Sequence, residues 1–136
     1  MIVIDASMAG PMVLIDEDPI SKAIAERLSG ETIVVPANWQ LECMSMLHVA
    51  EQRRRIDRGQ RIGAARQLRA LPVRVDRQTG ERAWSDTSRL ADEHSLTVYD
   101  AAYLELAIRS QAALATLDGD LRDAALASGV EVLTFK

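Results

Sequence analysis

Short apolar runs alternate with helical segments along the whole chain, and this alternation limits the folds that are open to it. The runs predict five strands, at residues 2–4, 32–35, 73–75, 113–117 and 130–133. Apolar residues at helical spacing predict helices at residues 7–15, 19–30, 38–54, 59–71, 79–94, 99–110 and 121–128. Strands that are apolar throughout are typical of a parallel sheet with helices on both faces. We therefore expect an α/β fold: a three-layer α/β/α sandwich with a mainly parallel central sheet.

Length and composition indicate one globular domain over residues 1–136. With 48% hydrophobic and 26% charged residues, the chain resembles neither a disordered nor a membrane-spanning protein. Its one cysteine, Cys43, excludes an internal disulfide framework and a cysteine-rich zinc site. The N-terminus lacks the basic segment of a signal peptide, so a cytoplasmic protein is expected.

Local sequence patterns predict the start of one helix and the buried face of another. Asp18 followed by Pro19 predicts an N-cap and the first residue of the second helix. In the helix at 79–94, one apolar face is expected to hold Ala83, Trp84, Thr87, Leu90 and Ala91. Trp84 is therefore expected in the core or in a dimer interface.

Charge is unevenly distributed along the chain. Residues 51–82 hold ten arginines and four acids, whereas the chain as a whole has a net charge of −4. Such a basic segment indicates either contact with an anionic polymer or the solvated faces of two helices. Because guanidinium groups bind phosphate bidentately, we expect phosphate-binding residues among the arginines at its start. They are Arg53, Arg54, Arg55, Arg58 and Arg61.

Three acids follow strands or begin helices, where side chains of a parallel sheet converge. Asp5 directly follows the first strand, and Asp118 the fourth. Ligands of open α/β sheets bind beyond these carboxyl ends. Asp100 begins a helix with strongly apolar neighbours. Each of the three has an alternative interpretation as a helix N-cap.

Glu42 interrupts the apolar stripe of the helix at 38–54, which includes Trp39, Cys43 and Leu47. A buried carboxylate needs an arginine, a proton or a metal, unless it lies at the edge of the stripe. If Asp5, Glu42, Asp100 and Asp118 converge, their mutual repulsion favours a bound divalent cation. An all-oxygen ligand set favours Mg²⁺, or Mn²⁺, over Zn²⁺. We call these four residues the acidic quartet.

The segments that carry the acids resemble those of a known family. They are Ile-Val-Ile-Asp-Ala-Ser at 2–7, Val-Pro-Ala-Asn-Trp-Gln-Leu-Glu at 35–42, Leu-Thr-Val-Tyr-Asp-Ala-Ala-Tyr-Leu-Glu-Leu-Ala at 96–107 and Leu-Ala-Thr-Leu-Asp-Gly-Asp-Leu at 114–121. In this order and spacing the chain is similar to PIN-domain ribonucleases, and more narrowly to VapC-type toxins of bacterial toxin–antitoxin pairs. The Cys-Met-Ser-Met sequence at 43–46 departs from the family, which often has small residues and an asparagine there.

The resemblance implies a Mg²⁺-dependent endoribonuclease that leaves 5′-phosphate and 3′-hydroxyl ends. By the resemblance, Asp5, Asp100 and Asp118 would hold the metal, and Glu42 would act on the attacking water. Thr116 and Asp120 match auxiliary positions. With RNA as the implied substrate, the arginines at 53–55, 58 and 61 are the expected RNA-binding residues. The resemblance also implies a homodimer and a small cognate antitoxin whose C-terminal segment occupies the cleft.

Two other functional classes compete with this interpretation. A catalytically silent PIN-like module would bind RNA or protein, but the intact quartet argues against it. A Mg²⁺-dependent phosphatase or receiver domain also gathers aspartates at strand ends. A receiver is expected to have a late lysine, whereas the only lysines here are Lys22 and Lys136.

Overall fold

A computed structural model describes residues 1–14 and 16–133 of the chain and has one five-stranded, all-parallel sheet. Its strands are β1 (Ile2–Ile4), β2 (Ile33–Val35), β3 (Val73–Val75), β4 (Ala113–Ala115) and β5 (Val132–Leu133). They lie in the order β3-β2-β1-β4-β5. In the register, Ile2 is opposite Ile33 of β2 on one side and Ala113 of β4 on the other. The first strand is therefore central, and the expected parallel sheet is confirmed.

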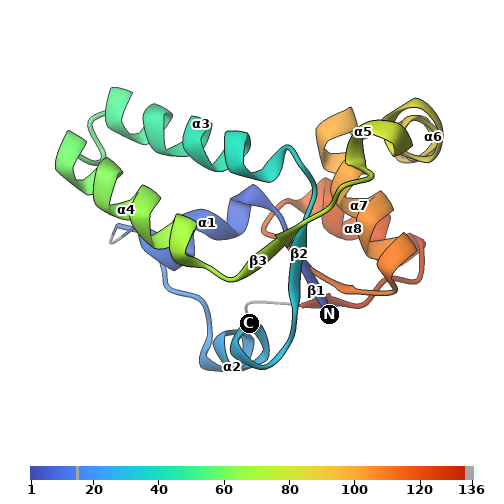
Figure 1. The fold of residues 1–136 in the computed structure, drawn as a ribbon, viewed down its shortest axis with the longest axis horizontal. Helices are drawn as coiled ribbons and strands as arrows, with labels where there is room; N and C mark the ends of the chain where they lie inside the picture. Colours follow the sequence, from blue (N-terminus) through green and yellow to red (C-terminus); the bar gives the residue numbers. More distant parts are fainter. Residues whose placement is uncertain (15, 134–136) are drawn as a thin grey trace.

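Helices cover both faces of this sheet (Figure 1). They are α1 (Ala9–Val13), α2 (Lys22–Gly30), α3 (Trp39–Gln52), α4 (Arg58–Ala70), α5 (Thr79–Arg82), α6 (Ser88–His94), α7 (Val98–Ser110) and α8 (Gly119–Ala127), with a 3₁₀ turn η1 (Ala6–Met8). All residues of β1, β2 and β4 are buried, whereas Arg74 in the edge strand β3 is exposed. Strands apolar on both sides need cover on both sides, and the helices supply it.

The long helices α3 and α4 form an antiparallel pair that extends away from the sheet (Figure 1). Their buried residues include Trp39, Cys43 and Leu47 from α3 and Leu68 from α4. Asp57 caps α4, because its side chain accepts from the Gln60 N–H at 2.7 Å, and the Asp57 N–H donates to the Gln60 side-chain oxygen at 2.8 Å. This capping box fixes where the second helix of the pair begins.

Two local predictions are wrong. The second helix begins at Lys22 and is capped by Ser21, whose hydroxyl accepts from the Ile24 N–H at 3.2 Å, so Asp18 is not its cap. In the helix at 79–94, a π-helical turn, η2 (Ala83–Thr87), separates α5 from α6. Thr87 and Leu90 are buried, as expected of that face, but the wider turn shifts the helical register, and Ala83 is exposed and Trp84 is 87% exposed. Trp84 is therefore outside the core, and of its two expected places only the dimer interface is compatible with this exposure.

No helix within residues 1–14 and 16–133 is long and apolar enough to cross a bilayer. Ile15, the last residue of the helix expected at 7–15, lies outside the described residues, as do residues 134–136.

Candidate active site

Asp5 lies at the carboxyl end of the central strand and is only 4% exposed. Its carboxylate accepts hydrogen bonds from the Ser7 hydroxyl at 2.5 Å and from the Thr116 hydroxyl at 2.6 Å. Burial raises the pKa of Asp5 to about 6 against the lowering effect of these bonds, and the charges of Asp100 and Asp118 raise it further. The Asp5 side chain makes no N-cap bond to the 3₁₀ turn that follows. It is therefore a buried acid whose pKa is raised by burial and by the charges of two other acids.

Asp118 lies at the end of the neighbouring strand and does cap a helix. Its carboxylate accepts from the Leu121 N–H at 2.9 Å, at the start of α8. Its own N–H donates to the Thr116 hydroxyl at 3.0 Å, and that hydroxyl donates to Asp5. Thr116 thus connects the loops after β1 and β4. The N-cap interpretation and a place beside Asp5 both apply to Asp118.

Asp100 lies in the first turn of α7 without serving as its cap. Thr97 is the cap, because its hydroxyl accepts from the Asp100 N–H at 3.1 Å. Burial raises the pKa of Asp100, and the charges of Asp118, Glu42 and Asp120 add to that rise. The Asp100 carboxylate is therefore left for another role.

Glu42 is half-buried in the first turn of α3, where neutral donors hold it. The Tyr103 hydroxyl donates to its carboxylate at 2.9 Å, and the Asn38 side-chain amide donates to the same oxygen. Burial, and next the charge of Glu42, raise the pKa of the Tyr103 hydroxyl above its ordinary value. The expected partner of this acid was an arginine, a proton or a metal. Among the described residues, the hydrogen-bond donors to this carboxylate are an amide and a phenol, both neutral, so the charge of Glu42 is not neutralised by them.

The acids form one electrostatic cluster, because Asp100 interacts with Glu42 as well as with Asp118, and Asp118 also acts on Asp5. Its carboxylate oxygens are the donors that a hard divalent cation prefers, so the chemistry of the site fits Mg²⁺ or Mn²⁺. Within the described chain, however, no three His, Cys, Asp or Glu side chains are already placed to hold a metal ion. The described residues therefore supply oxygen donors at the carboxyl end of the sheet, but three of them are not yet close enough together to coordinate one ion.

Comparison with known proteins places this arrangement in a family. The pattern of the PIN domain matches residues 2–127. The chain belongs to the PIN-domain family. Ribonuclease VapC12 of Mycobacterium tuberculosis is 34% identical over 123 residues, which is 89% of each protein, so this PIN domain is of the VapC type. The resemblance seen in the sequence is confirmed.

Solved structures show the same PIN fold. PAE2754 from Pyrobaculum aerophilum superposes with a TM-score of 0.69 at 21% identity, over 96% of this chain and 82% of that one. VapC20 from Mycobacterium tuberculosis, a toxin that cleaves the sarcin–ricin loop, superposes with a TM-score of 0.62 at 21% identity. The match covers 91% of this PIN domain and 95% of VapC20.

A second polar cluster of the PIN domain, which sequence reasoning missed, braces the loop before Glu42. Asp76 follows β3 at the same edge and accepts two bonds from the Arg109 guanidinium, at 3.1 and 2.7 Å. Although burial opposes it, the bonds from Arg109 and Thr79 hold the pKa of Asp76 below its ordinary value. The Thr79 hydroxyl also accepts from the Ala37 N–H at 3.0 Å, next to Asn38. Asp76 directly follows a predicted strand, and this position was the sequence signal that could have revealed it.

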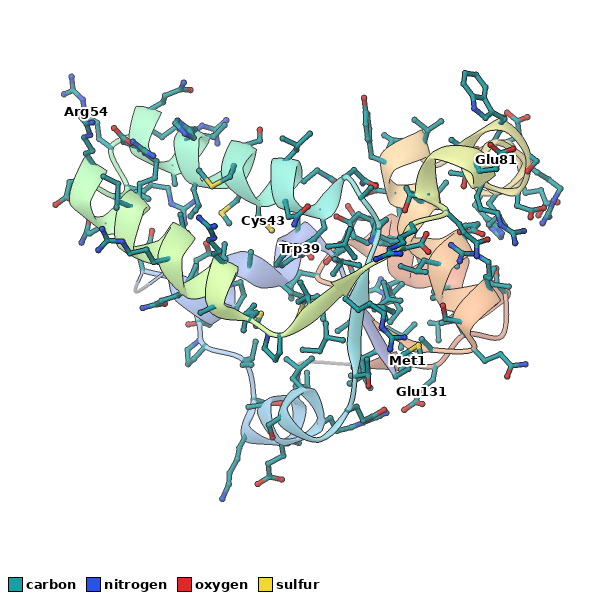
Figure 2. The ribbon with its side chains drawn as sticks, in the orientation of Figure 1. Met1, Trp39, Cys43, Arg54, Glu81 and Glu131 are labelled. Atoms are coloured by element: carbon teal, nitrogen blue, oxygen red, sulfur yellow. The ribbon has the colours of Figure 1, made fainter. Side chains whose placement is uncertain are left out.

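The arginines expected to bind RNA lie at the far end of the α3–α4 pair. Figure 2 shows Arg54 at this tip and Trp39 and Cys43 at the end near the sheet. Arg55 pairs with Asp16 and Glu17, each at 3.0 Å. Arg61 pairs with Glu51. Within the described residues, Arg53, Arg54 and Arg58 are exposed and make no ion pair, so they are the members of this group whose charge faces solvent.

Proposed function

We propose that this VapC-type PIN domain is a Mg²⁺-dependent endoribonuclease that acts as the toxin of a toxin–antitoxin pair. The observation that carries the proposal is Asp5. Its buried carboxylate has a raised pKa because of burial and because of two further acids of the quartet. An enzyme that places mutually repelling carboxylates at the ligand edge of a parallel sheet gains by binding a divalent cation there. The identity to Ribonuclease VapC12 supports RNA as the substrate.

The residues divide into metal ligands and groups that act on water. Asp5, Asp100 and Asp118 would hold Mg²⁺, or Mn²⁺ in its place. When bound, such a cation lowers the pKa of a water molecule and offsets negative charge on phosphate oxygens. Glu42 would orient the attacking water or accept its proton.

Neighbouring side chains would keep these groups in place. Asn38 and Tyr103 restrict the Glu42 carboxylate through their hydrogen bonds. Thr116 fixes Asp5 and the loop that leads to Asp118. Asp120, whose charge acts on Asp100, would be an auxiliary acid at the rim. The exposed arginines Arg53, Arg54 and Arg58, with Arg55 and Arg61 in their ion pairs, would contact RNA phosphates.

The partners follow from the VapC type. A small cognate antitoxin would neutralise this chain, which would act as a homodimer in the cytoplasm. VapC20 is described as a toxin, which supports the same role here. The competing function is a catalytically silent module that binds RNA or protein. Such a module would not need the four acids, whose mutual repulsion costs free energy when no cation is bound.

The test is cleavage of labelled total RNA by the purified protein in Mg²⁺ and in EDTA, with the new ends mapped. We expect defined cuts that require Mg²⁺ and leave 5′-phosphate and 3′-hydroxyl ends. Asp92→Asn, which removes an exposed acid on α6, is the matched control for quartet variants and should cleave normally. RNA binding without cleavage in Mg²⁺ or Mn²⁺ would favour the silent module.

The toxin role has its own test in cells. Induced expression should arrest growth, and co-expression of a small protein encoded next to this gene should restore it. Asp100→Asn should not arrest growth. Arrest by that variant would separate toxicity from the proposed nuclease.

A further inference from the structure

Exposed apolar side chains directly precede three of the four quartet acids. Leu41 before Glu42 is 77% exposed, Tyr99 before Asp100 is 60% exposed, and Leu117 before Asp118 is 47% exposed. A single exposed apolar residue is ordinary. Three that each adjoin an acid of one cluster in the sequence point to contact with another molecule near that cluster.

Tyr99 is the second residue of α7 and directly precedes Asp100. It is four residues before Tyr103, so the two side chains project from the same side of the helix. The Tyr103 hydroxyl contacts Glu42, which shows that this side of α7 faces the start of α3. Tyr103 is fully buried, whereas Tyr99, one turn nearer the helix end, is exposed. The Tyr99 ring is therefore at the border of the site, one residue from Asp100.

Leu117 borders the site from the loop between β4 and α8. Its N–H donates to the Ser7 hydroxyl at 2.8 Å, and that hydroxyl donates to Asp5 at 2.5 Å. The backbone of Leu117 is thus fixed to the most buried acid of the quartet. Its exposed side chain is a second apolar group at the border, from a different element.

We propose that Tyr99 stacks on the nucleobase next to the scissile phosphate and that Leu117 supports this contact. The proposal rests on the proposed nuclease function. If the scissile phosphate is bound at the quartet, the base of the adjoining nucleotide lies close to the cluster. A side chain adjacent to Asp100 can reach that base. Aromatic and aliphatic groups bind the face of any base, and the base must be unpaired to present that face.

The aromatic content limits the contact to one base. Trp84 and Tyr99 are the only exposed aromatic side chains in the part of the chain that the structure describes, and only Tyr99 adjoins an acid of the quartet. Several bases cannot be stacked in a row by one ring. The contact would require an unpaired base at a single position beside the cut. It would accept different bases there, because every base has a π-face.

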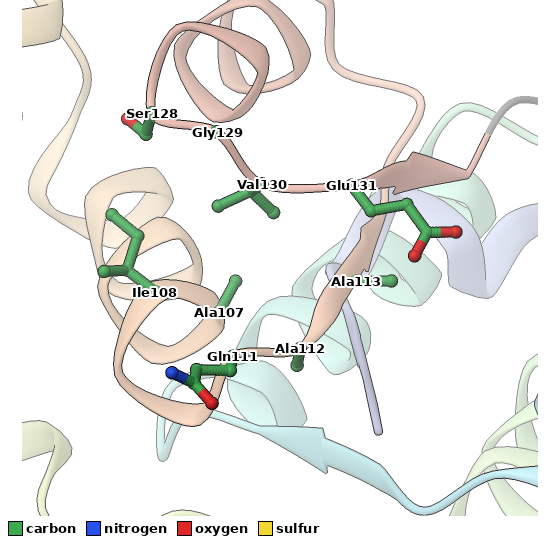
Figure 3. Close-up of a pocket in the computed structure, with 9 residues that line it drawn as sticks. All are labelled: Ala107, Ile108, Gln111, Ala112, Ala113, Ser128, Gly129, Val130 and Glu131. Carbon is green, nitrogen blue, oxygen red and sulfur yellow. The ribbon is translucent and has the colours of Figure 1, made fainter.

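The test is a double-mutant cycle between Tyr99 and the RNA. The substrate is a short single-stranded RNA that spans a cut mapped in total RNA, with one nucleoside beside the scissile phosphate made abasic. If no cut is found, short oligouridine with an abasic position replaces it. We measure cleavage efficiency in Mg²⁺ and, separately, affinity in EDTA. Ile108→Ala is the matched control, because Ile108 is an exposed apolar residue of the same helix that lines a cavity of about 330 Å³ at the opposite edge of the sheet (Figure 3).

We expect Tyr99→Ala to weaken binding of the intact RNA by roughly tenfold to a hundredfold. The abasic position should weaken binding of the RNA to the wild-type protein by a similar factor. Together the two changes should have no further effect, and Tyr99→Phe should retain the contact. Leu117→Ala should give a smaller loss. Additive effects, or an equal loss in Ile108→Ala, would overturn the proposal. So would a Tyr99→Ala defect that comes with a changed oligomeric state, since a second copy would then cover the ring.

The two readouts separate this proposal from the proposed function. A non-additive cycle in EDTA with no cleavage in Mg²⁺ would contradict the nuclease and support the stacking contact. Cleavage that is indifferent to Tyr99 and to the abasic position would support the nuclease and contradict the contact.

Discussion

The hydroxyl of Tyr103 donates a 2.9 Å hydrogen bond to Glu42, a residue 61 positions earlier in the chain. This bond joins α7, which carries Asp100, to α3, which carries Glu42. Asn38 donates to the same carboxylate oxygen from within α3. Glu42 is therefore held between one local and one distant donor.

Tyr103→Phe should lower kcat by about tenfold, because Glu42 loses one of the two donors that orient it. Affinity for Mg²⁺ should change little, since Asp5, Asp100 and Asp118 remain. Steady-state kinetics with a mapped RNA and calorimetric Mg²⁺ titration give the two values. In a Glu42→Gln background the same substitution should have no further effect on kcat. A further loss there would mean that Tyr103 acts by another route.

Metal-free stability should depend on pH through Asp5. Its pKa is about 6 in the folded protein and has an ordinary value of 3.8, so folding favours the protonated carboxyl. That contribution is complete below the ordinary value and is lost as the pH rises through about 6. In EDTA, the unfolding free energy of wild type should therefore fall relative to Asp5→Asn, by roughly 2 kcal/mol between pH 4 and pH 7. Denaturant unfolding measures it, and a pH-independent difference would contradict the raised pKa.

The ion pairs of Arg109 should matter more to stability than those on the surface. Arg109 contacts Asp76 and the buried Glu105, the latter at 2.7 Å. Arg109→Met should lower the unfolding free energy by about 3–5 kcal/mol, because Asp76 loses its cation and the buried Glu105 keeps only the more distant Arg82, at 3.9 Å. Arg89→Met removes an exposed partner of Glu93 and should cost less than about 1 kcal/mol. Equal losses would show that the buried pair has no special weight.

The arginines at the tip of α3 and α4 should differ in their effect on RNA binding. Replacing Arg53 and Arg58 with alanine should weaken RNA binding. It should also reduce the slope of the logarithm of the binding constant against the logarithm of salt concentration by about 1.4, if each arginine contacts one phosphate of a single strand. Arg61→Ala should change the slope less, because Glu51 already neutralises that guanidinium. Affinity measured over a range of salt concentrations gives the slopes. An unchanged slope in the double variant would confine these residues to a solvated surface.

The sheet could be predicted because its strands are apolar on both faces, which is a local property of the sequence. Asp5 and Asp118 could be placed at one edge for the same reason, since each follows a strand. The apolar stripe of α3 also identified Trp39, Cys43 and Leu47 as buried.

What could not be predicted depends on distant contacts or on helix geometry. Nothing near Glu42 in the sequence shows that the Tyr103 hydroxyl reaches it. Trp84 was misplaced because a uniform helical period was assumed, whereas the π turn changes the period at that residue. The pairing of Arg55 with Asp16 and Glu17 depends on a loop whose path the sequence does not reveal.

The claim on which the nuclease depends is that the quartet gathers around one hard cation, and a crystal structure with Mn²⁺ tests it most directly. The anomalous signal should show Mn²⁺ bonded to carboxylate oxygens of Asp5, Asp100 and Asp118, and crystals of Asp100→Asn should lose that peak. Mn²⁺ bound elsewhere, with these carboxylates apart and unligated at saturating metal, would contradict the account.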